Sequence, residues 1–303
     1  MSIAVVILTY NEELHLARAL RSVAPLTKEV YVIDSFSTDD TVKIARSHGV
    51  DVRQRAFDNQ ARQFNWALDT LTIRSDWILR LDADEVIEPD LAAEIAARLP
   101  GMERDVVGVN LKRKHIFMNR WIRHGGRYPL ELLRIWRRGY GRVEDRWMDE
   151  HVVVKGGRTV TFDGGFSDHN LNDLTFFTDK HNKYATREAI EVLNQRLHFM
   201  TQEAELSTAN SSRQAALKRA LKERIYNRIP FQFSALSYFL YRYLLQVGFL
   251  DGKEGLIYHG LQGFWYRFLV GAKIEELSRA VSDLREPADI RAQLSRLTGL
   301  KLG

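Results

Sequence analysis

Apolar and polar residues alternate in blocks along the first hundred positions, and each block favours a strand or a helix in turn. The apolar run at 4–8 is typical of a strand buried on both faces of a parallel sheet. Further strands are expected at 29–34, 50–52 and 76–81, with helices at 14–23, near 42–45 and around 64–68. This alternation predicts a parallel sheet with right-handed crossovers.

Polar residues stand where three of the predicted strands end. They are Thr9-Tyr10-Asn11, Asp34-Ser35 and Asp82-Ala83-Asp84. Because ligands bind beyond the carboxyl ends of parallel strands, these three tips predict one site at one edge of the sheet.

The third tip carries two carboxylates two residues apart, Asp82 and Asp84. At an extended tip they point to the same side and can share a hard cation with the phosphate oxygens of a ligand. The alternative is an acidic helix start, since Glu85, Glu88 and Asp90 follow and suit a helix dipole. The match to the other two tips favours the cation. The sequence has neither G-x-G-x-x-G after the first strand nor G-x-x-x-x-G-K-[ST], which argues against the usual dinucleotide and P-loop sites.

Three segments resemble the signatures of family-2 glycosyltransferases, which have the GT-A fold, in residue type, order and spacing. They are Thr9-Tyr10-Asn11-Glu12, the run from Asp34 to Thr41, and Leu81-Asp82-Ala83-Asp84-Glu85. Residues 61–67 resemble the Arg/Asn helix of that family. Residues 147–151, 169–174 and 180–185 resemble the branch that builds bacterial lipopolysaccharide core and exopolysaccharide.

The resemblance implies an α/β fold, a Rossmann-like mixed sheet flanked by helices, in a catalytic domain over 1–200. Residues 1–100 would bind the nucleotide sugar and 101–200 the acceptor. A helical, aromatic-rich extension over 201–303 would follow, with an amphipathic hairpin at 229–271.

The resemblance also implies site residues. The donor, a nucleotide-diphosphate sugar with UDP the first expectation, would be bound by Thr9, Tyr10, Asn11, Glu12, Asp34, Arg62, Asp82 and Ala83. Asp34 would accept from the base or ribose, and Arg62 would reach the diphosphate or the base. Asp84 would ligate Mg²⁺ or Mn²⁺, with Glu85 as a competing ligand. His169, after a loop at 164–168 that would close over the diphosphate, is either a further metal ligand or a structural histidine.

An inverting displacement at the anomeric carbon requires a base for the acceptor hydroxyl. The family's pattern favours Glu150, with Asp149 second. The alternative is that both are solvated acids paired with Arg146 and Arg142.

The composition is that of a globular protein: 303 residues, 45% hydrophobic and 27% charged. The absence of cysteine excludes a disulfide framework and Cys-ligated metal sites. Residues 1–100 carry 11 Lys/Arg against 16 Asp/Glu, whereas 101–303 carry 33 against 23. A basic rear suits nucleic acid, an anionic membrane or a phosphorylated substrate. The N-terminus lacks the basic start of a signal peptide, so we expect a cytoplasmic protein.

The sequence pattern after residue 200 predicts a basic helix at 205–228, then a helical hairpin, and a last helix at 290–297. Residues 226–268 hold 13 of the 32 aromatic residues. Two apolar arms, 231–250 and 256–270, flank a turn at 251–255. Arg242 disfavours a spanning helix, because a central arginine costs about 2.5–3.5 kcal/mol on insertion. The polar residues at every fourth position favour a helix lying in a membrane interface. The alternative is packing on the chain's own core or in a dimer.

We therefore expect an enzyme attached peripherally to the inner face of the cytoplasmic membrane, with a saccharide or lipid-linked saccharide as acceptor and no nucleic-acid partner. A sugar-phosphate nucleotidylyltransferase would need a Gly-rich, Arg-containing loop after the first strand, which is absent. An inactive scaffold that binds lipid or nucleic acid is the other alternative. The acids at 34, 82, 84 and 150 argue against it.

Overall fold

The computed structural model describes residues 2–145, 151–200 and 230–302. The chain divides into two compact units, residues 1–171 and 172–303. The predicted helix at 205–228 and both candidate bases, Asp149 and Glu150, lie outside the described residues. The predicted functional boundaries at residues 100 and 200 stay predictions.

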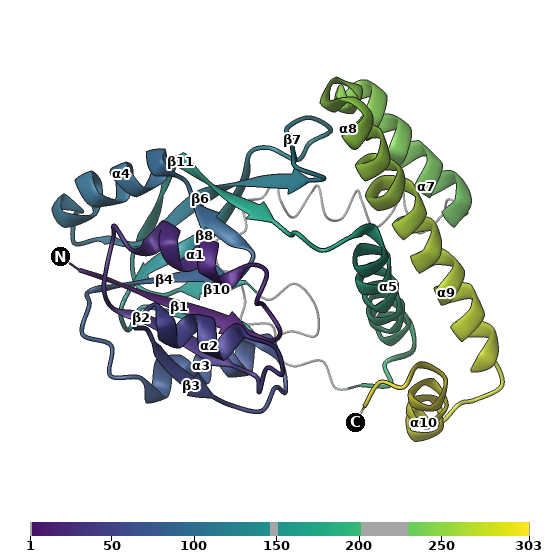
Figure 1. Ribbon diagram of the computed structural model, residues 1–303. Coiled ribbons are helices and arrows are strands. Elements are labelled where there is room, and N and C mark those ends of the chain that lie inside the picture. The colour runs from purple at the N-terminus through teal and green to yellow at the C-terminus, as the bar shows by residue number, and fades with distance from the viewer. Residues whose placement is uncertain (1, 146–150, 201–229, 303) are drawn as a thin grey trace. The chain divides into compact units, whose positions relative to one another are not determined.

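The first unit is built on a nine-stranded mixed sheet in the order β3-β2-β1-β4-β8-β6-β11-β5, with β7 paired to β6 (Figure 1). The strands are β1 Ile3–Thr9, β2 Val30–Asp34, β3 Asp51–Gln54, β4 Trp77–Asp82, β5 Glu85–Ile87, β6 Val106–Phe117, β7 Arg120–Ile122, β8 Leu130–Arg137 and β11 Arg158–His169. The first four in this order are mutually parallel, whereas β5, β7 and β8 run the other way. A separate hairpin pairs β9 Gly141–Val143 with β10 Val152–Val154.

Helices cover both faces of this sheet. They are α1 Leu16–Val23, α2 Thr41–Ser47, α3 Gln60–Thr70 and α4 Pro89–Arg98, with a 3-10 turn η1 at Leu99–Gly101. Val5 and Ile7 of β1 join a core with α1, α2 and α4, while Ala4 and Val6 join a second core with α3 and the β9–β10 hairpin. Both faces of β1 are therefore buried, which accounts for its uninterrupted apolar run. The expected mixed α/β fold with flanking helices is confirmed, and so are the predicted strands and helices of this unit.

One local expectation is wrong, and the alternative to the cation site fails at its first residue. Residues 164–168 are not a closing loop, because they form the last part of β11, paired with β6 and β5. A Cβ on Gly164 would lie 2.5 Å from Cα of Leu91, so this glycine lets α4 approach the strand. The alternative, an acidic helix start directly after Asp84, is not what the structure has. Glu85 begins β5, and α4 starts at Pro89.

The second unit is helical, as expected. It contains α5 Leu174–Leu197, α7 Phe231–Leu240, α8 Gly252–Tyr258, α9 Tyr266–Ala280 and α10 Pro287–Thr298, with irregular turns η2 Tyr241–Leu245, η3 Gly248–Asp251 and η4 His259–Trp265. α8 begins inside the turn predicted at 251–255. α10 packs with α5 and α9 in a core that includes Leu193, Leu277 and Leu294.

A buried arginine joins the parallel half of the sheet to the rest. Arg134 of β8 donates from Nη2 to Oε1 of Glu85 at 2.5 Å and to Oδ2 of Asp82 at 3.2 Å. The Asp82 backbone N–H donates to Oε2 of Glu85 at 2.9 Å. Glu85 is only 2% exposed and Arg134 6%. Both carboxyl oxygens of Glu85 are thus engaged within the chain, and Glu85 is not a spare ligand for a cation.

The surroundings shift the pKa values of the two acids, Glu85 and Asp82, in opposite directions. Burial raises the pKa of Glu85, and the charge of Asp82 adds to that effect against the attraction of Arg134. Burial acts on Asp82 in the same direction, but Arg134 and Arg80 outweigh it and hold the pKa of Asp82 well below its usual range. Asp82 is therefore the ionised member at neutral pH.

We expect Arg134→Gln to lower the free energy of unfolding by about 3–5 kcal/mol near pH 8, since it leaves buried carboxylates without their counter-charge. A carboxyl whose folded pKa lies above its unfolded value costs stability as pH rises between the two. The loss should therefore be smaller at pH 5, where Glu85 is fully protonated and only Asp82 loses a counter-charge.

Urea unfolding of variant and parent at both pH values measures the difference. Arg158→Gln, at an exposed pair with Glu103 and Asp105, is the matched control and should change little at either pH. An Arg134→Gln loss that is the same at pH 5 and pH 8 would contradict this account.

Candidate functional site

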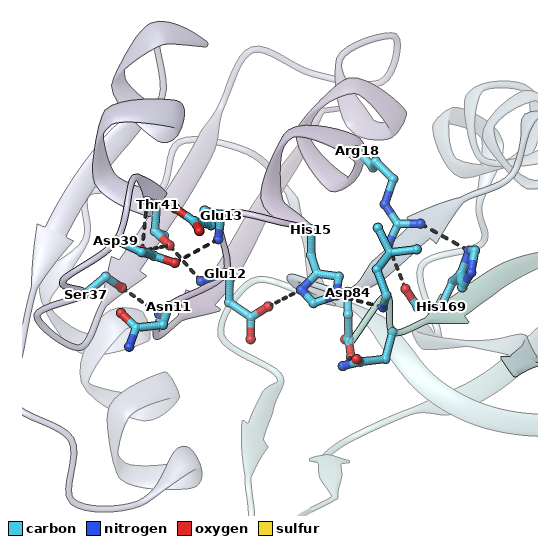
Figure 2. A network of polar contacts seen from close by, with 12 residues as sticks. Asn11, Glu12, Glu13, His15, Arg18, Ser37, Asp39, Thr41, Asp84 and His169 are labelled. Carbon is cyan, nitrogen blue, oxygen red and sulfur yellow. Dashed lines mark hydrogen bonds and ion pairs between the residues drawn. The ribbon is translucent and has the colours of Figure 1, made fainter. Parts of the chain in front are cut away.

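The segments that follow β1 and β2 are held together at the predicted edge of the sheet by reciprocal hydrogen bonds (Figure 2). Backbone N–H groups of the first segment donate to side chains of the second, and backbone N–H groups of the second segment donate to side chains of the first. The contacts are Asn11 N to Ser37 Oγ, 2.9 Å; Glu12 N to Thr41 Oγ1, 2.7 Å; Glu13 N to Asp39 Oδ2, 3.1 Å; Thr38 N to Asn11 Oδ1, 2.9 Å; and Asp40 N to Glu13 Oε2, 3.0 Å. Asn11 and Phe36 have φ of 55° and 60°. Such left-handed residues cluster at functional sites.

Asp34 is completely buried beneath these segments. Its carboxylate accepts from Thr9 Oγ1 at 3.1 Å, from Ser37 Oγ at 2.5 Å and Ser37 N at 2.9 Å, and from Gln54 Nε2 at 3.0 Å. It therefore connects the ends of β1, β2 and β3. Both carboxylate oxygens of Asp34 already accept two hydrogen bonds each, so a base or ribose would be an additional donor. The predicted contact between Asp34 and the nucleotide stays a prediction.

The remaining donor-side residues differ in exposure. Tyr10 is 60% exposed, whereas Thr9 and Ala83 are buried. Arg62 lies in the first turn of α3, where Asn59 caps the helix by accepting from the Arg62 N–H. Nε of Arg62 donates to Oδ2 of Asp145 at 2.7 Å, so its guanidinium is held by a carboxylate.

Asp84 and His169 lie together, as Figure 2 shows. The backbone N–H of His169 donates to the Asp84 carbonyl at 3.0 Å, and Asn170 Nδ2 donates to Asp84 Oδ2 at 3.1 Å. Arg18 donates to the His169 carbonyl at 2.6 Å, and its Nη1 is 3.1 Å from Nδ1 of the ring. Nε2 of His169 lies 3.1 Å from Oδ1 of Asn119.

These contacts determine the tautomer of His169. An arginine only donates, so Nδ1 accepts from Arg18 and Nε2 carries the hydrogen that Asn119 accepts. Burial, followed by the charge of Arg18, lowers the pKa of His169 and keeps its ring neutral at pH 7. Both ring nitrogens are engaged, and the ring would have to exchange one partner to bind a metal.

A second histidine connects the two parts of the site. Nδ1 of His15 is 2.7 Å from Oε2 of Glu12, and Nε2 accepts from the Leu171 N–H at 2.9 Å. Our sequence reasoning missed both His15 and Arg18. The available signal was their spacing of three residues at the start of the helix after the first tip, which puts them on one face.

The side chains at this site could hold a cation only together with a ligand. No three His, Asp or Glu side chains within the described ranges form a ready-made metal-binding group. Asp82 is engaged with two arginines, which leaves Asp84 as the carboxylate of the pair suited to the role. Mg²⁺ is often bound by one or two carboxylates together with substrate phosphates. Asp84 and a diphosphate therefore fit such an ion.

Comparison with known proteins gives relatives over part of the chain. Uncharacterised glycosyltransferases of Rickettsia typhi and Rickettsia prowazekii are 41% and 40% identical over 93 residues, which cover 31% of this chain and 31% of each relative. The glycosyltransferase SunS of Bacillus phage SPbeta is 33% identical over 92 residues, 30% of this chain and 22% of SunS. The matches thus span about a third or less of the length of these relatives.

Among solved structures, glucosyl-3-phosphoglycerate synthase from Mycobacterium tuberculosis, in complex with Mn²⁺, UDP and glucosyl-3-phosphoglycerate, is 23% identical. That match covers 38% of this chain and 44% of the synthase chain, with a TM-score of 0.32. The family described as "Glycosyl transferase family 2" matches residues 4–163, more than half of the chain. The chain therefore belongs to glycosyl transferase family 2.

Proposed function

We propose that this protein is a metal-dependent, inverting glycosyltransferase. It would move a sugar from a nucleotide-diphosphate sugar, with UDP the first candidate, to a lipid-linked saccharide in the synthesis of cell-envelope polysaccharide. Family membership supports the transfer itself. The observation that carries the donor assignment is the position of Asp84 at the edge where the linked segments after β1 and β2 also end.

In this proposal each carboxylate at the end of β4 has its own task. Asp84 would hold Mg²⁺ or Mn²⁺, which when bound offsets the charge that develops on the departing diphosphate. Asp82, held by Arg80 and Arg134, would orient the sugar or ribose. His169 would support Asp84 through its backbone N–H or take a place beside the cation. Tyr10 would lie against the base, with Asn11 and Glu12 shaping the segment that follows.

The acceptor hydroxyl requires a base, and we propose Glu150, with Asp149 as the alternative. Both lie outside the described residues. Their described neighbours Glu144 and His151 are hydrogen-bonded through the backbone, N to O, at 2.9 Å.

We propose membrane contact through the apolar surface of residues 231–268. Leu245 is 77% exposed, Phe233 60%, and Leu244 52%. Arg242 of the same segment is 5% exposed, and its guanidinium lies 5.5 Å from the ring of Tyr238. Apolar side chains thus face outward while the arginine is covered, a pattern that suits an interface with lipid. No helix in the described part of the chain is both long and apolar enough to cross a bilayer.

The first test concerns the cation. Transfer and donor hydrolysis, measured with a panel of nucleotide sugars and Mn²⁺, should stop in EDTA. Asp84→Asn should lower turnover on the order of 10²–10³-fold, because charge in the transition state is no longer neutralised. Asp90→Asn, at an exposed acid in the first turn of α4, is the control and should keep full activity. Undiminished activity in EDTA would remove the cation from the mechanism.

The second test concerns the base. Glu150→Gln should lose turnover and keep its affinity for UDP, since a base acts on the acceptor and not on the donor. Calorimetric titration with UDP and Mn²⁺, alongside the transfer assay, separates the two effects. If Asp149→Asn is the inactive variant instead, the base is Asp149, and if both variants are active, neither residue is the base.

The third test concerns the membrane. The protein should float with vesicles containing anionic lipid at low salt and be released as salt rises. Leu244→Asp with Leu245→Asp should abolish flotation, because charged side chains resist insertion at the interface. Leu297→Asp, at a 50%-exposed leucine of α10, is the matched control. Equal flotation of the two variants would exclude the surface at 231–268 as the lipid contact.

A further inference from the structure

Two residues at the start of α1 contact the segment at 169–171. His15 directly precedes the helix, and Arg18 lies in its first turn. Their spacing of three residues puts both side chains on one face of the helix. Figure 2 shows Arg18 directed toward His169, whose backbone N–H donates to the carbonyl of Asp84 at 3.0 Å. The start of α1 is therefore connected through one residue to the carboxylate that we propose for the cation.

The segment at 169–171 lies at the end of β11 and beyond it. The ladder between β11 and β6 ends at His169. After it, the Leu171 N–H donates to Nε2 of His15 at 2.9 Å. At the other end of the segment, Arg18 donates to the His169 carbonyl at 2.6 Å, and its Nη1 lies 3.1 Å from Nδ1 of the ring. The segment is thus attached to the start of α1 at both of its ends.

The middle residue of the segment contacts the carboxylate of Asp84. Nδ2 of Asn170 donates to Oδ2 of Asp84 at 3.1 Å. Because both ends of the segment are held by α1, the direction from which Asn170 reaches Asp84 depends on those contacts. Changing a group that orients a metal-binding side chain typically costs about 10–100-fold in metal affinity or activity.

The side chain of Arg18 suits this task through its planar set of donors. A guanidinium can bond the carbonyl and the ring of one histidine at the same time, whereas a lysine presents a single charged group. Burial lowers the pKa of Arg18, and the charge of Asp84 opposes that shift. Nε of Arg18 is buried and has no hydrogen-bond partner among the described residues. A desolvated charge and an unpaired donor both cost stability, which favours a role in the site over one in packing alone.

We propose that Arg18 is a positioning residue for the cation site, and that it fixes the segment at 169–171 so that Asn170 holds the carboxylate of Asp84 in place. The inference rests on the proposed role of Asp84 and extends the cation site to α1. The charge of Arg18 alone would act in the opposite direction, because a positive group near Asp84 repels a metal ion. The sign of the effect on metal affinity therefore separates positioning from charge.

The test measures the affinity of the full chain for Mn²⁺ in the presence of UDP, by electron paramagnetic resonance of the free ion. We expect Arg18→Met to weaken Mn²⁺ binding about 10–100-fold. Arg18→Lys keeps the charge but not the planar donors, so it should weaken binding too, and it replaces Arg18→Met if that variant does not fold. Circular dichroism and urea unfolding check the folded state. Arg21→Met is the matched control and should bind Mn²⁺ as the parent does, since Arg21 lies further along α1 and donates to the Ala17 carbonyl of its own helix.

A double-mutant cycle with Asn170→Ala tests the route by which Arg18 acts. If Arg18 works through the segment, the losses of Mn²⁺ affinity in Arg18→Met and Asn170→Ala should not add, because the second change removes the contact that the first one misplaces. A general effect on the fold would give losses that add in full, and that result would contradict the inference.

Unchanged or tighter Mn²⁺ binding by the Arg18 variants would also overturn it, since tighter binding is what the loss of a positive charge alone produces. The parent protein separates this failure from that of the proposed function. If the parent binds no Mn²⁺ with UDP, the proposed cation role and the inference fail together. If the parent binds Mn²⁺ and the Arg18 variants equal it, only the inference is wrong.

Discussion

The contact of Arg134 with Glu85 and Asp82 is the constraint on which the site depends. Strand β8 supplies the cation, while β4 and β5 supply the acids, so one side chain sets the register between the parallel strands and the antiparallel part of the sheet. A buried ion pair gives little net stability, because desolvation offsets most of the attraction. Its effect here is to orient the side chains at the end of β4. Asp82 is turned toward the arginines, and Asp84 follows it at the sheet edge.

The two carboxylates of the D-x-D sequence are therefore not equivalent. Burial and Asp82 together raise the pKa of Glu85, and Asp82 keeps its charge through Arg134 and Arg80. The negative charge of Asp82 is thus balanced by two arginines of the same chain. Asp84 has a different setting: its carboxylate accepts from the Asn170 amide, its backbone carbonyl accepts from the His169 N–H, and its charge interacts with the Arg18 guanidinium. A divalent ion beside Asp82 would meet the charges of two arginines, which disfavours that position.

The features that the sequence predicted are those that depend on local periodicity. A strand buried on both faces is a continuous apolar run, and parallel topology alone brings Thr9, Asp34 and Asp82 to one edge. The features it missed depend on contacts between distant residues. Arg134 and Glu85 are 49 positions apart, and Arg18 and His169 are 151 apart. The loop wrongly predicted at 164–168 has the same cause. Two adjacent glycines are typical of a loop, but Gly164 serves the approach of α4, which no local pattern reveals.

Two histidines extend the hydrogen-bonded network from the segment after β1 to the β6–β7 hairpin. His15 contacts Glu12 and accepts from Leu171, and His169 accepts from Arg18 and donates to Asn119. Only a neutral imidazole can accept and donate at once, so protonation of His169 would set its new N–H against the guanidinium of Arg18. Burial and Arg18 itself oppose that protonation. The charge that orders the backbone of His169 also preserves the tautomer that holds the β6–β7 hairpin, so the position of that hairpin depends on Arg18, a residue of α1.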